Sequence, residues 1–238
     1  DEGRRLLIVT GETHQPGAGG IEKRYQDLSR WAEQFGLTEI TYRWSAQDYS
    51  TSDNVPFVGR YPGRDGFWLA TGFGGWGMTN SVAAARLLAA SVTDGTVPDW
   101  AEAFDPHRFH PMSEVKSIAG VLGSTARNFV ARPGGAIAVD SVDDVRAGEA
   151  AVLRISGEEV AVYRDDEGEL HAVGARCSHR GCRVGFNEVE RAWECPCHGS
   201  RFDVSGAVLQ GPALQPLPRK TVPDASTPKA THEGGDDR

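Results

Sequence analysis

The chain has 238 residues, a formal net charge of -8 at pH 7 and four cysteines. Nothing in this acidic sequence resembles the clustered basic face that nucleic-acid binding requires, and no apolar run approaches the length of a membrane span. The four cysteines all lie between Cys177 and Cys197 and are interleaved with histidines. That distribution indicates a metal site rather than a secreted protein stabilised by disulfides along its length.

The first part of the chain mixes predicted strands and helices. Ile21, Tyr25, Leu28, Ala32 and Phe35 recur at helical spacing, and a glycine follows at the expected helix end. A second helix is expected after residue 78, capped by the threonine or asparagine at 79 or 80. We predict a loose loop over residues 15–20, and strands over residues 5–10 (buried), 39–44, 55–59 and 67–71.

The character of the sequence changes after residue 110. Residues 111–135 predict a helical connector, and packing of its apolar stripe on a neighbouring domain is favoured over a membrane-surface helix. Residues 136–222 then show short β-like runs, for example at 151–155, 159–163 and 169–173. The predicted domains are therefore residues 1–110, a connector at 111–135, an all-β domain at 136–222 and a disordered tail at 223–238.

The residues that carry chemistry are concentrated in two short loops. Residues 177–182 read C-S-H-R-G-C and residues 195–200 read C-P-C-H-G-S, so each loop presents one Cys-and-His pair. A [2Fe–2S] cluster with two thiolates on one iron and two imidazoles on the other requires this set. The same four residues could also bind a structural zinc ion tetrahedrally. Zinc, however, leaves the second cysteine pair, the glycines and Ser200 unexplained.

Both loops resemble the cluster-binding motifs of Rieske proteins of the disulfide-containing type, and the resemblance extends over residues 136–222. Residues 211–213 (G-P-A) resemble the proline-rich third loop that covers the cluster in that family. The implied fold is a small antiparallel β-structure with a cluster-binding subdomain. The implied ligands are Cys177 and Cys195 on one iron, and His179 and His198 on the other.

The same resemblance concerns residues that surround the cluster. It implies a disulfide between Cys182 and Cys197, which we place at matched positions of the two loops, where it would clamp them. Ser200 matches a hydroxyl that bonds the cluster in high-potential members, whereas Phe202 stands where those members carry tyrosine. Arg180 replaces a usual apolar residue, and its charge would raise the potential if it were poorly solvated. Because fewer hydrogen bonds to sulfur lower the potential, we expect a value below that of respiratory-chain Rieske proteins.

A second resemblance lies in the first half. Residues 53–59 and 70–79 resemble the C-terminal part of the flavin-dependent D-amino acid oxidase and glycine oxidase family, and residues 44–49 resemble its bacterial subfamily with a fused Rieske domain. Glycines let the backbone approach a flat ring closely, and the following helix N-terminus suits an electron-rich reduced flavin. The predicted flavin contacts are Gly72, Phe73, Gly74, Gly75, Trp76, Gly77, Met78 and Thr79.

Two elements of the flavin family are missing from the sequence. No G-x-G-x-x-G follows the first predicted strand, and residues 17–20 lack its spacing, so we expect a chain from within a longer protein that cannot hold FAD alone. Gln47 and Asp48 occupy the neighbourhood where the family places an arginine for the substrate carboxylate. Amino-acid oxidation is therefore not predicted. The substrate stays open, with small amines as one class.

Together these patterns predict an α+β fold, in which a partial flavin-oxidoreductase α/β segment precedes an all-β Rieske domain. The predicted function is electron transfer through a Rieske [2Fe–2S] cluster, coupled to an FAD-dependent oxidoreductase acting on a small-molecule substrate. The electron acceptor is not specified, and the family resemblance favours the cytoplasm. Two alternatives remain open: a free-standing Rieske electron carrier in which residues 1–110 only dock a partner, and a zinc-stabilised interaction module.

Overall fold

The computed structural model describes residues 6–222 apart from 38, 94, 109–110, 131–133 and 138. Its contacts divide the chain into two compact units, one drawn from residues 1–42 and 125–238 and the other from residues 43–124. The four-part division expected from the sequence stays a prediction, and its tail at 223–238 lies outside the described residues. None of the described helices is both long enough and apolar enough to cross a membrane.

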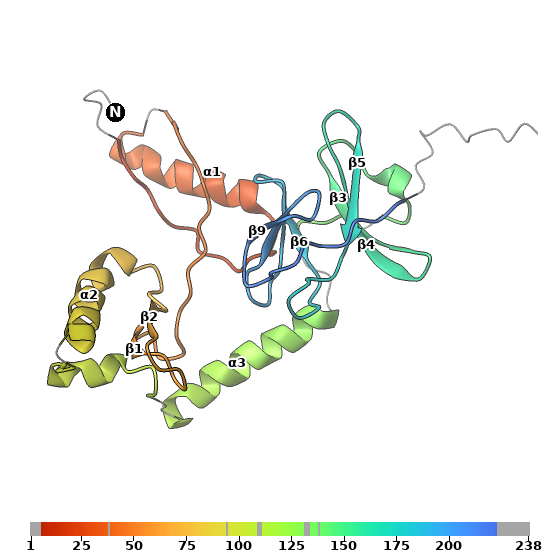
Figure 1. Ribbon diagram of the computed structural model, residues 1–238. Coiled ribbons are helices and arrows are strands. Elements are labelled where there is room, and N and C mark those ends of the chain that lie inside the picture. Colours follow the sequence, from red (N-terminus) through yellow and green to blue (C-terminus); the bar gives the residue numbers. More distant parts are fainter. Residues whose placement is uncertain are drawn as a thin grey trace, which may run out of the picture. The chain divides into compact units, whose positions relative to one another are not determined.

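The first unit contains two antiparallel sheets (Figure 1). One sheet consists of β3 (Ala150–Ile155), β4 (Glu158–Arg164) and β5 (Leu170–Gly174), which confirms the three predicted strands of this region. The other consists of β6 (Gly185–Asn187), β7 (Ala192–Glu194), β8 (Arg201–Asp203) and β9 (Val208–Gln210). These four strands are three residues each and show no periodicity in the sequence. A short 3-10 helix, η3 (Val142–Asp144), precedes β3.

The β3–β5 sheet is buried on both faces. Along β4, Ala161 and Tyr163 join one buried cluster, whereas Val160 and Val162 join another on the opposite face. This arrangement explains why β4 reads as a continuous apolar run rather than as an alternating one. The first of these clusters also contains Trp193 and cysteines of both cysteine- and histidine-containing loops, so the predicted site is built on the core of the unit.

The N-terminal part of the first unit is helical. Helix α1 (Ile21–Ala32) continues into η1 (Glu33–Phe35) and ends at Gly36, whose φ of 82° is left-handed, as predicted. Figure 1 shows one end of α1 close to the β6–β9 sheet, and Glu188, between β6 and β7, is hydrogen-bonded to the first residues of the helix. The predicted strands at residues 5–10 and 39–44 are wrong, since the described residues of both segments form no strand and expose most of their large apolar side chains. A strand requires a hydrogen-bonded neighbour, and the described part of the chain places none beside them.

The second unit contains the hairpin of β1 (Phe57–Arg60) and β2 (Trp68–Thr71), which confirms two predicted strands. Helix α2 (Gly77–Thr93) and η2 (Asp99–Phe104) follow, and the small core consists of Val58, Ala84 and Leu87. The expected cap at residue 79 or 80 is wrong. Helix α2 begins at Gly77, and the backbone N–H of Asn80 already donates to the carbonyl of Trp76 at 2.9 Å.

The predicted connector is one continuous helix. Helix α3 (Pro111–Val130) contributes residues to both compact units. In the second unit, Glu114 is buried and accepts a hydrogen bond of 2.7 Å from the hydroxyl of Ser52. In the first unit, the side chain of Asn128 reaches the carbonyl of Pro196 at 3.5 Å. Each end of this helix is therefore held by side-chain bonds within its own unit.

Candidate metal centre

The two cysteine- and histidine-containing loops share one backbone conformation. In each loop the N–H of the first cysteine, Cys177 or Cys195, donates to the carbonyl five residues later at 2.8 Å. In each loop a glycine, Gly181 or Gly199, donates back to the carbonyl of that cysteine, at 2.8 and 2.9 Å respectively. Both glycines have a φ of 76°, a left-handed conformation that an L-residue adopts only at a cost. The sequence therefore folds each ligand pair onto the same tight turn.

This shared conformation corrects one sequence prediction. Cys182 occupies the place in the first loop that Ser200 occupies in the second, and Cys197 corresponds to His179. The two cysteines are therefore not at matched positions. Their predicted disulfide is nevertheless confirmed, with Cα atoms 6.4 Å apart, and it joins the end of one turn to the middle of the other.

The four predicted ligands lie together between the two turns. The thiols of Cys177 and Cys195 are buried, are not in a disulfide and are hydrogen-bonded to each other. The rings of His179 and His198 lie beside each other, with centroids 4.9 Å apart at an angle of 83°. Nδ1 of His179 is buried and has no hydrogen-bond partner among the described residues. A buried nitrogen without a hydrogen-bond partner is costly unless it binds a metal or another group, so Nδ1 of His179 is suited to bind a metal.

Backbone and hydroxyl donors converge on the sulfur of Cys177. Its pKa is lowered to about 6, chiefly by the hydrogen bond with the thiol of Cys195. The N–H groups of His179 and Arg180 and the hydroxyl of Ser200 act in the same direction, against the effect of burial. Because a metal binds the thiolate and not the thiol, this environment prepares Cys177 as a ligand.

The second sulfur is arranged in the same way. The N–H groups of Cys197 and His198 donate to Cys195, although the shared hydrogen bond with Cys177 and burial raise the pKa of Cys195 overall. In the protein without metal, one proton is thus held between two sulfurs. A cation that replaced this proton would leave two thiolates, each with its own N–H donors.

The histidine side of the site is more open. His198 reaches the surface, yet partial burial of its ring lowers its pKa, and the neighbouring His179 and Arg180 act in the same direction. A lowered pKa favours the neutral imidazole that metals require. Two thiolates supplied with N–H donors and two neutral imidazoles fit the ligand set of a Rieske-type [2Fe–2S] cluster.

The predicted third loop lies against both turns. The N–H of Ala213 donates to the hydroxyl oxygen of Ser200 at 3.0 Å, and the hydroxyl of Ser178 donates to the carbonyl of Gln215 at 2.5 Å. Ser200 is fully buried between the sulfur of Cys177 and this loop. The third loop therefore shields the cysteine side of the site from water.

The other two predicted tuning residues differ in environment. Phe202 is fully buried on β8, in the cluster of core side chains that includes both ligand cysteines. Arg180 is exposed, so solvent screens its charge and weakens the increase in potential that its charge would otherwise cause.

Sequence analysis missed an ionic cluster that anchors the first turn. Glu159 on β4 pairs with Arg176, which precedes Cys177, and with Arg183, which follows Cys182. Burial raises the pKa of Glu159, but the two guanidinium groups outweigh it, so that the pKa lies below its usual range. One carboxylate therefore holds both ends of the turn.

The predicted flavin-contacting turn lies in the second unit, and the chain itself explains two of its glycines. A Cβ at Gly72 would lie 2.5 Å from Cγ2 of Thr51, and one at Gly74 would lie 3.0 Å from Oγ of Ser50. Together with the left-handed φ values of 77° and 56°, these contacts favour glycine at both positions. Around Gly75, in contrast, there is open space within 4 Å.

The rest of this turn faces solvent. Trp76 and Met78 are exposed, and the N–H of Gly75 donates to the carboxylate of Asp48. Helix α2 begins directly behind the turn, so the partial positive charge of its N-terminus lies where the flavin was expected. The contacts of Gly72, Phe73, Gly74, Gly75, Trp76, Gly77, Met78 and Thr79 with a flavin stay a prediction.

Comparison with known proteins assigns a family to each half. Residues 135–223 match the family model described as Rieske [2Fe-2S] domain, and residues 1–91 match the one described as FAD dependent oxidoreductase. The chain joins a Rieske domain to an FAD-dependent oxidoreductase segment. Both resemblances predicted from the sequence are thereby confirmed, together with the α+β fold class and the two cofactors that these families imply, a [2Fe–2S] cluster and FAD.

Two curated relatives agree with this assignment, and one solved structure is also similar in sequence. A Bacillus subtilis protein described as a Rieske 2Fe-2S iron-sulfur protein, YhfW, is 37% identical over 220 residues, which are 90% of this chain and 42% of that protein. Cytochrome b6-f complex iron-sulfur subunit 2 of Trichormus variabilis is 39% identical over 29% of this chain and 39% of its own length. The plasma membrane Rieske protein PetC3 of Synechocystis PCC 6803 is 31% identical over 36% of this chain and 87% of its own, with a TM-score of 0.32. The chain thus spans less than half the length of both curated relatives.

The oxidoreductase segment contacts the Rieske domain directly, which the sequence did not indicate. The predicted loose loop at residues 15–20 is instead packed, with Gly17 and Gly19 buried. The N–H of Gly17 donates to Oε2 of Glu194 at 2.9 Å, and its carbonyl accepts from the N–H of Gly134 at 2.9 Å. A Cβ at Gly19 would lie 2.2 Å from the backbone nitrogen of Gly135. These glycines lack the spacing of a phosphate-binding loop. They instead allow the backbone of this loop to pass close to the backbone at Gly134 and Gly135.

The same contact caps helix α1. Oε1 of Glu188, in the Rieske domain, accepts hydrogen bonds from the N–H groups of Ile21 and Glu22 at 2.6 and 3.2 Å. A carboxylate at a helix N-terminus satisfies unpaired N–H groups and complements the helix dipole. The side chain of Ile21 is fully buried beside this cap.

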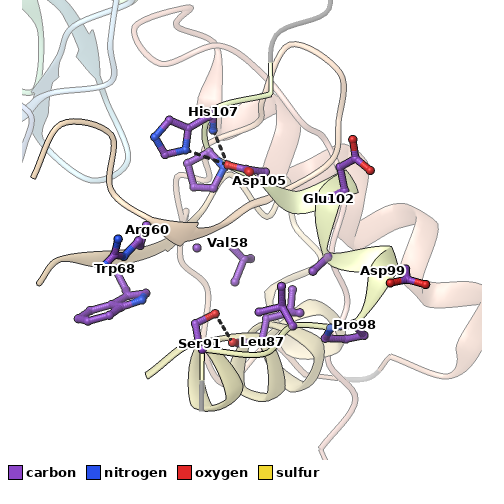
Figure 2. A pocket seen from close by; sticks show the side chains of 15 residues that line it. Val58, Arg60, Trp68, Leu87, Ser91, Pro98, Asp99, Glu102, Asp105 and His107 are labelled. Atoms are coloured by element: carbon purple, nitrogen blue, oxygen red, sulfur yellow. Dashed lines mark hydrogen bonds and ion pairs between the residues drawn. The ribbon is translucent and has the colours of Figure 1, made fainter. Parts of the chain in front are cut away.

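A pocket in the second unit lies away from the predicted flavin turn (Figure 2). It has a volume of about 730 Å³ and is formed by β1, β2, α2 and η2, with Val58 and Leu87 at its apolar base. Asp105 and His107, whose side chains are hydrogen-bonded at 3.0 Å, lie on its polar side. None of the residues at 72–79 is among the described residues that line it.

Proposed function

We propose that this chain binds a Rieske [2Fe–2S] cluster through Cys177, His179, Cys195 and His198, and that it carries electrons for the FAD-dependent oxidoreductase of which it is part. The observation that carries this proposal is the buried pair of unoxidised cysteines beside the partnerless Nδ1 of His179. The disulfide from Cys182 to Cys197 joins the two turns around these atoms.

A cluster of this type, when bound, takes up and releases one electron at a time. The residues around it hold the two thiolates with backbone N–H donors and Ser200, and Ala213 covers this side of the site. Fixed donors aimed at sulfur stabilise negative charge without rearrangement, which favours the reduced state. His198 is exposed, and Leu214 in the third loop is exposed as well, so a redox partner can approach the histidines.

We also propose that the oxidoreductase half of the chain contributes to binding of FAD. Its family implies FAD, and the exposed turn with Gly75 in front of α2 is the place where this chain offers space to a flat ring. We propose a small substrate, with amines as one class, because Gln47 and Asp48 stand where the related amino-acid oxidases place an arginine. The electron acceptor is open, and a cytoplasmic location stays a prediction from the family resemblance.

The first experiment is a visible absorption spectrum of the purified chain, oxidised and then reduced with dithionite, with iron, sulfide and zinc measured on the same sample. Broad bands that bleach on reduction, with iron equal to sulfide, are the expected result. Cys195→Ser tests the ligand set, and Ser205→Ala, at a polar turn after β8, is the matched control. A colourless protein that contains zinc would contradict the proposal and would favour a zinc-stabilised interaction module.

Flavin is tested separately. Added flavin bands, or quenching of FAD fluorescence on titration, would support cofactor binding by the 238-residue chain. A normal cluster spectrum without any flavin binding, in this chain and in a longer one that contains the remaining family segment, would favour the free-standing carrier over the enzyme.

A further inference from the structure

One peptide bond next to the cluster site is hydrogen-bonded at both ends. The carbonyl of Pro196 accepts from Nε2 of Gln15 at 2.6 Å and, more weakly, from Nδ2 of Asn128 at 3.5 Å. The N–H of the same peptide belongs to Cys197 and donates to the sulfur of the ligand Cys195. Gln15 thus reaches a cluster ligand through a single peptide group.

Hydrogen bonds in such a chain strengthen one another. A donor on a peptide carbonyl polarises the amide, so that its N–H becomes a stronger donor. The partner of this N–H is a sulfur that carries more negative charge when the cluster is reduced, and hydrogen bonds to ligand sulfur are one of the factors that set cluster potentials. The amide of Gln15 therefore stabilises the reduced state more than the oxidised state.

The position of Gln15 is set by the packing of its own segment. Two residues later, Gly17 is buried and bonded to Glu194, which directly precedes the ligand Cys195. Pro196 is buried, so its carbonyl oxygen depends on donors from the chain, which are Gln15 and Asn128. The side chain of Gln15 itself is exposed, and its substitution removes a hydrogen bond without opening a cavity in the core.

We propose that Gln15, which belongs to the FAD-dependent oxidoreductase segment, is a positioning residue that raises the reduction potential of the Rieske cluster through the Pro196–Cys197 peptide. The inference rests on the proposed function, because it needs the cluster on Cys195. It gives the contact between the two family segments a role in redox chemistry. The oxidoreductase segment then adjusts the potential of the centre that is proposed to take its electrons.

The test compares reduction potentials of Gln15→Leu and Gln34→Leu with that of the unaltered chain, by voltammetry or EPR-monitored titration. Gln34 is the matched control, because its Nε2 also donates to a backbone carbonyl, that of Trp31 at 2.7 Å, at an exposed place away from the cluster loops. At the midpoint of the unaltered chain, Gln15→Leu should lower the ratio of reduced to oxidised protein about two- to fourfold. Gln34→Leu should leave it unchanged.

A second pair of variants separates tuning from structure. Gln15→Glu keeps the shape but presents an oxygen to the carbonyl of Pro196, so the potential should fall at least as far as in Gln15→Leu. Asn128→Leu should shift the potential in the same direction by less, because its bond is longer. The unfolding temperature and the iron content of each variant are measured on the same samples.

The possible outcomes distinguish the two proposals. A normal cluster with an unchanged potential and unchanged EPR g-values in both Gln15 variants overturns the tuning role and leaves the proposed function intact. A lower unfolding temperature with an unchanged potential shows a purely structural contact and also overturns it. If the unaltered chain binds no iron and sulfide, both proposals fail. If Gln15→Leu does not fold, the result from Gln15→Glu decides.

Discussion

Gly17 and Glu194 lie 177 positions apart in the sequence and are joined by a buried hydrogen bond of 2.9 Å from the Gly17 N–H to Oε2 of Glu194. Glu194 also accepts from Nδ2 of Asn187 at 2.9 Å and pairs with Arg201. A buried carboxylate needs such partners, since an unpaired charge is costly. The oxidoreductase segment therefore completes a polar network inside the Rieske domain.

This relationship predicts different effects at two glycines with the same backbone conformation. Gly17 and Gly20 have φ values of 69° and 68°, so alanine costs about 1–2 kcal/mol at either position. At Gly17 the new Cβ also meets the carbonyl oxygen of Glu194 at 2.9 Å, whereas at Gly20 nothing lies within 4 Å. Gly17→Ala should therefore lower the unfolding temperature more and increase amide exchange over residues 15–22. Equal effects in the two variants would contradict this packing.

Ser200→Ala should lower the reduction potential by tens of millivolts. The hydroxyl of Ser200 donates a hydrogen bond to the sulfur of Cys177. A hydrogen bond to a charged group is worth about 1.5–3 kcal/mol, but the potential changes only by the difference between its strength in the reduced and in the oxidised state. The N–H of Ala213 also loses its acceptor, so stability should fall by about 1–3 kcal/mol. Voltammetry and thermal unfolding measure the two effects. A potential equal to that of the unaltered protein would exclude the hydroxyl as a tuning group.

Phe202→Tyr tests the absent second hydroxyl. Phe202 is fully buried near the ligand cysteines, so an added hydroxyl must find a partner or cost about 1–3 kcal/mol. We expect a bond to a cysteine sulfur, a higher potential and nearly unchanged stability. A drop in unfolding temperature without a change in potential would show that the hydroxyl does not reach sulfur.

The disulfide should matter for retention of the cluster. Replacing both Cys182 and Cys197 by serine removes a link across a sequence separation of 15, which is worth about 3 kcal/mol for a loop of this length. The two turns should then separate more easily, and iron loss at raised temperature, followed by the decay of visible absorption, should accelerate. The single variant Cys182→Ser leaves a free thiol and should behave similarly. Unchanged decay rates would mean that the third loop alone holds the turns.

The stability of the second unit should depend on acid through Asp53. The bidentate pairing of Asp53 with Arg108 holds the pKa of the carboxyl well below its usual range, and Arg108 also lies over the ring of Phe57. Because the folded pKa is depressed, the stabilisation is complete above the unfolded pKa of about 3.9 and is lost as the pH falls below it towards the folded value. Amide exchange over residues 57–60 should increase in this range.

Asp53→Asn is the matching variant for this pH dependence. It should destabilise the second unit by about 1.5–3 kcal/mol at neutral pH, because a charge-assisted pair is replaced by a neutral one. It should also remove most of the change in amide exchange below pH 4. A variant that keeps the full acid dependence would assign that dependence to other carboxylates.

Short-range patterns predicted an element correctly where the residues of that segment themselves determine its structure. Helix α1 continues into η1, which ends at Gly36 as expected, and β1 and β2 lie where two strands were predicted. Predictions failed where a partner elsewhere decides the outcome. Residues 6–10 and 39–44 have strand-like composition, yet they pair with no strand among the described residues. Composition cannot specify a neighbour that lies far along the chain.

The sequence by itself determined the metal chemistry of this protein. The four predicted ligands lie in two turns of six residues, and both the ligand types and the glycines are local features. Only the tertiary structure decided what surrounds them. Gln15 reaches Pro196, and Glu188 caps α1. Both contacts are possible because the backbone crosses closely at Gly17 and Gly19, which brings segments more than 160 residues apart into hydrogen-bonding distance. Such contacts depend on where whole sheets and loops are placed, and that placement is a property of the folded chain rather than of any short stretch within it.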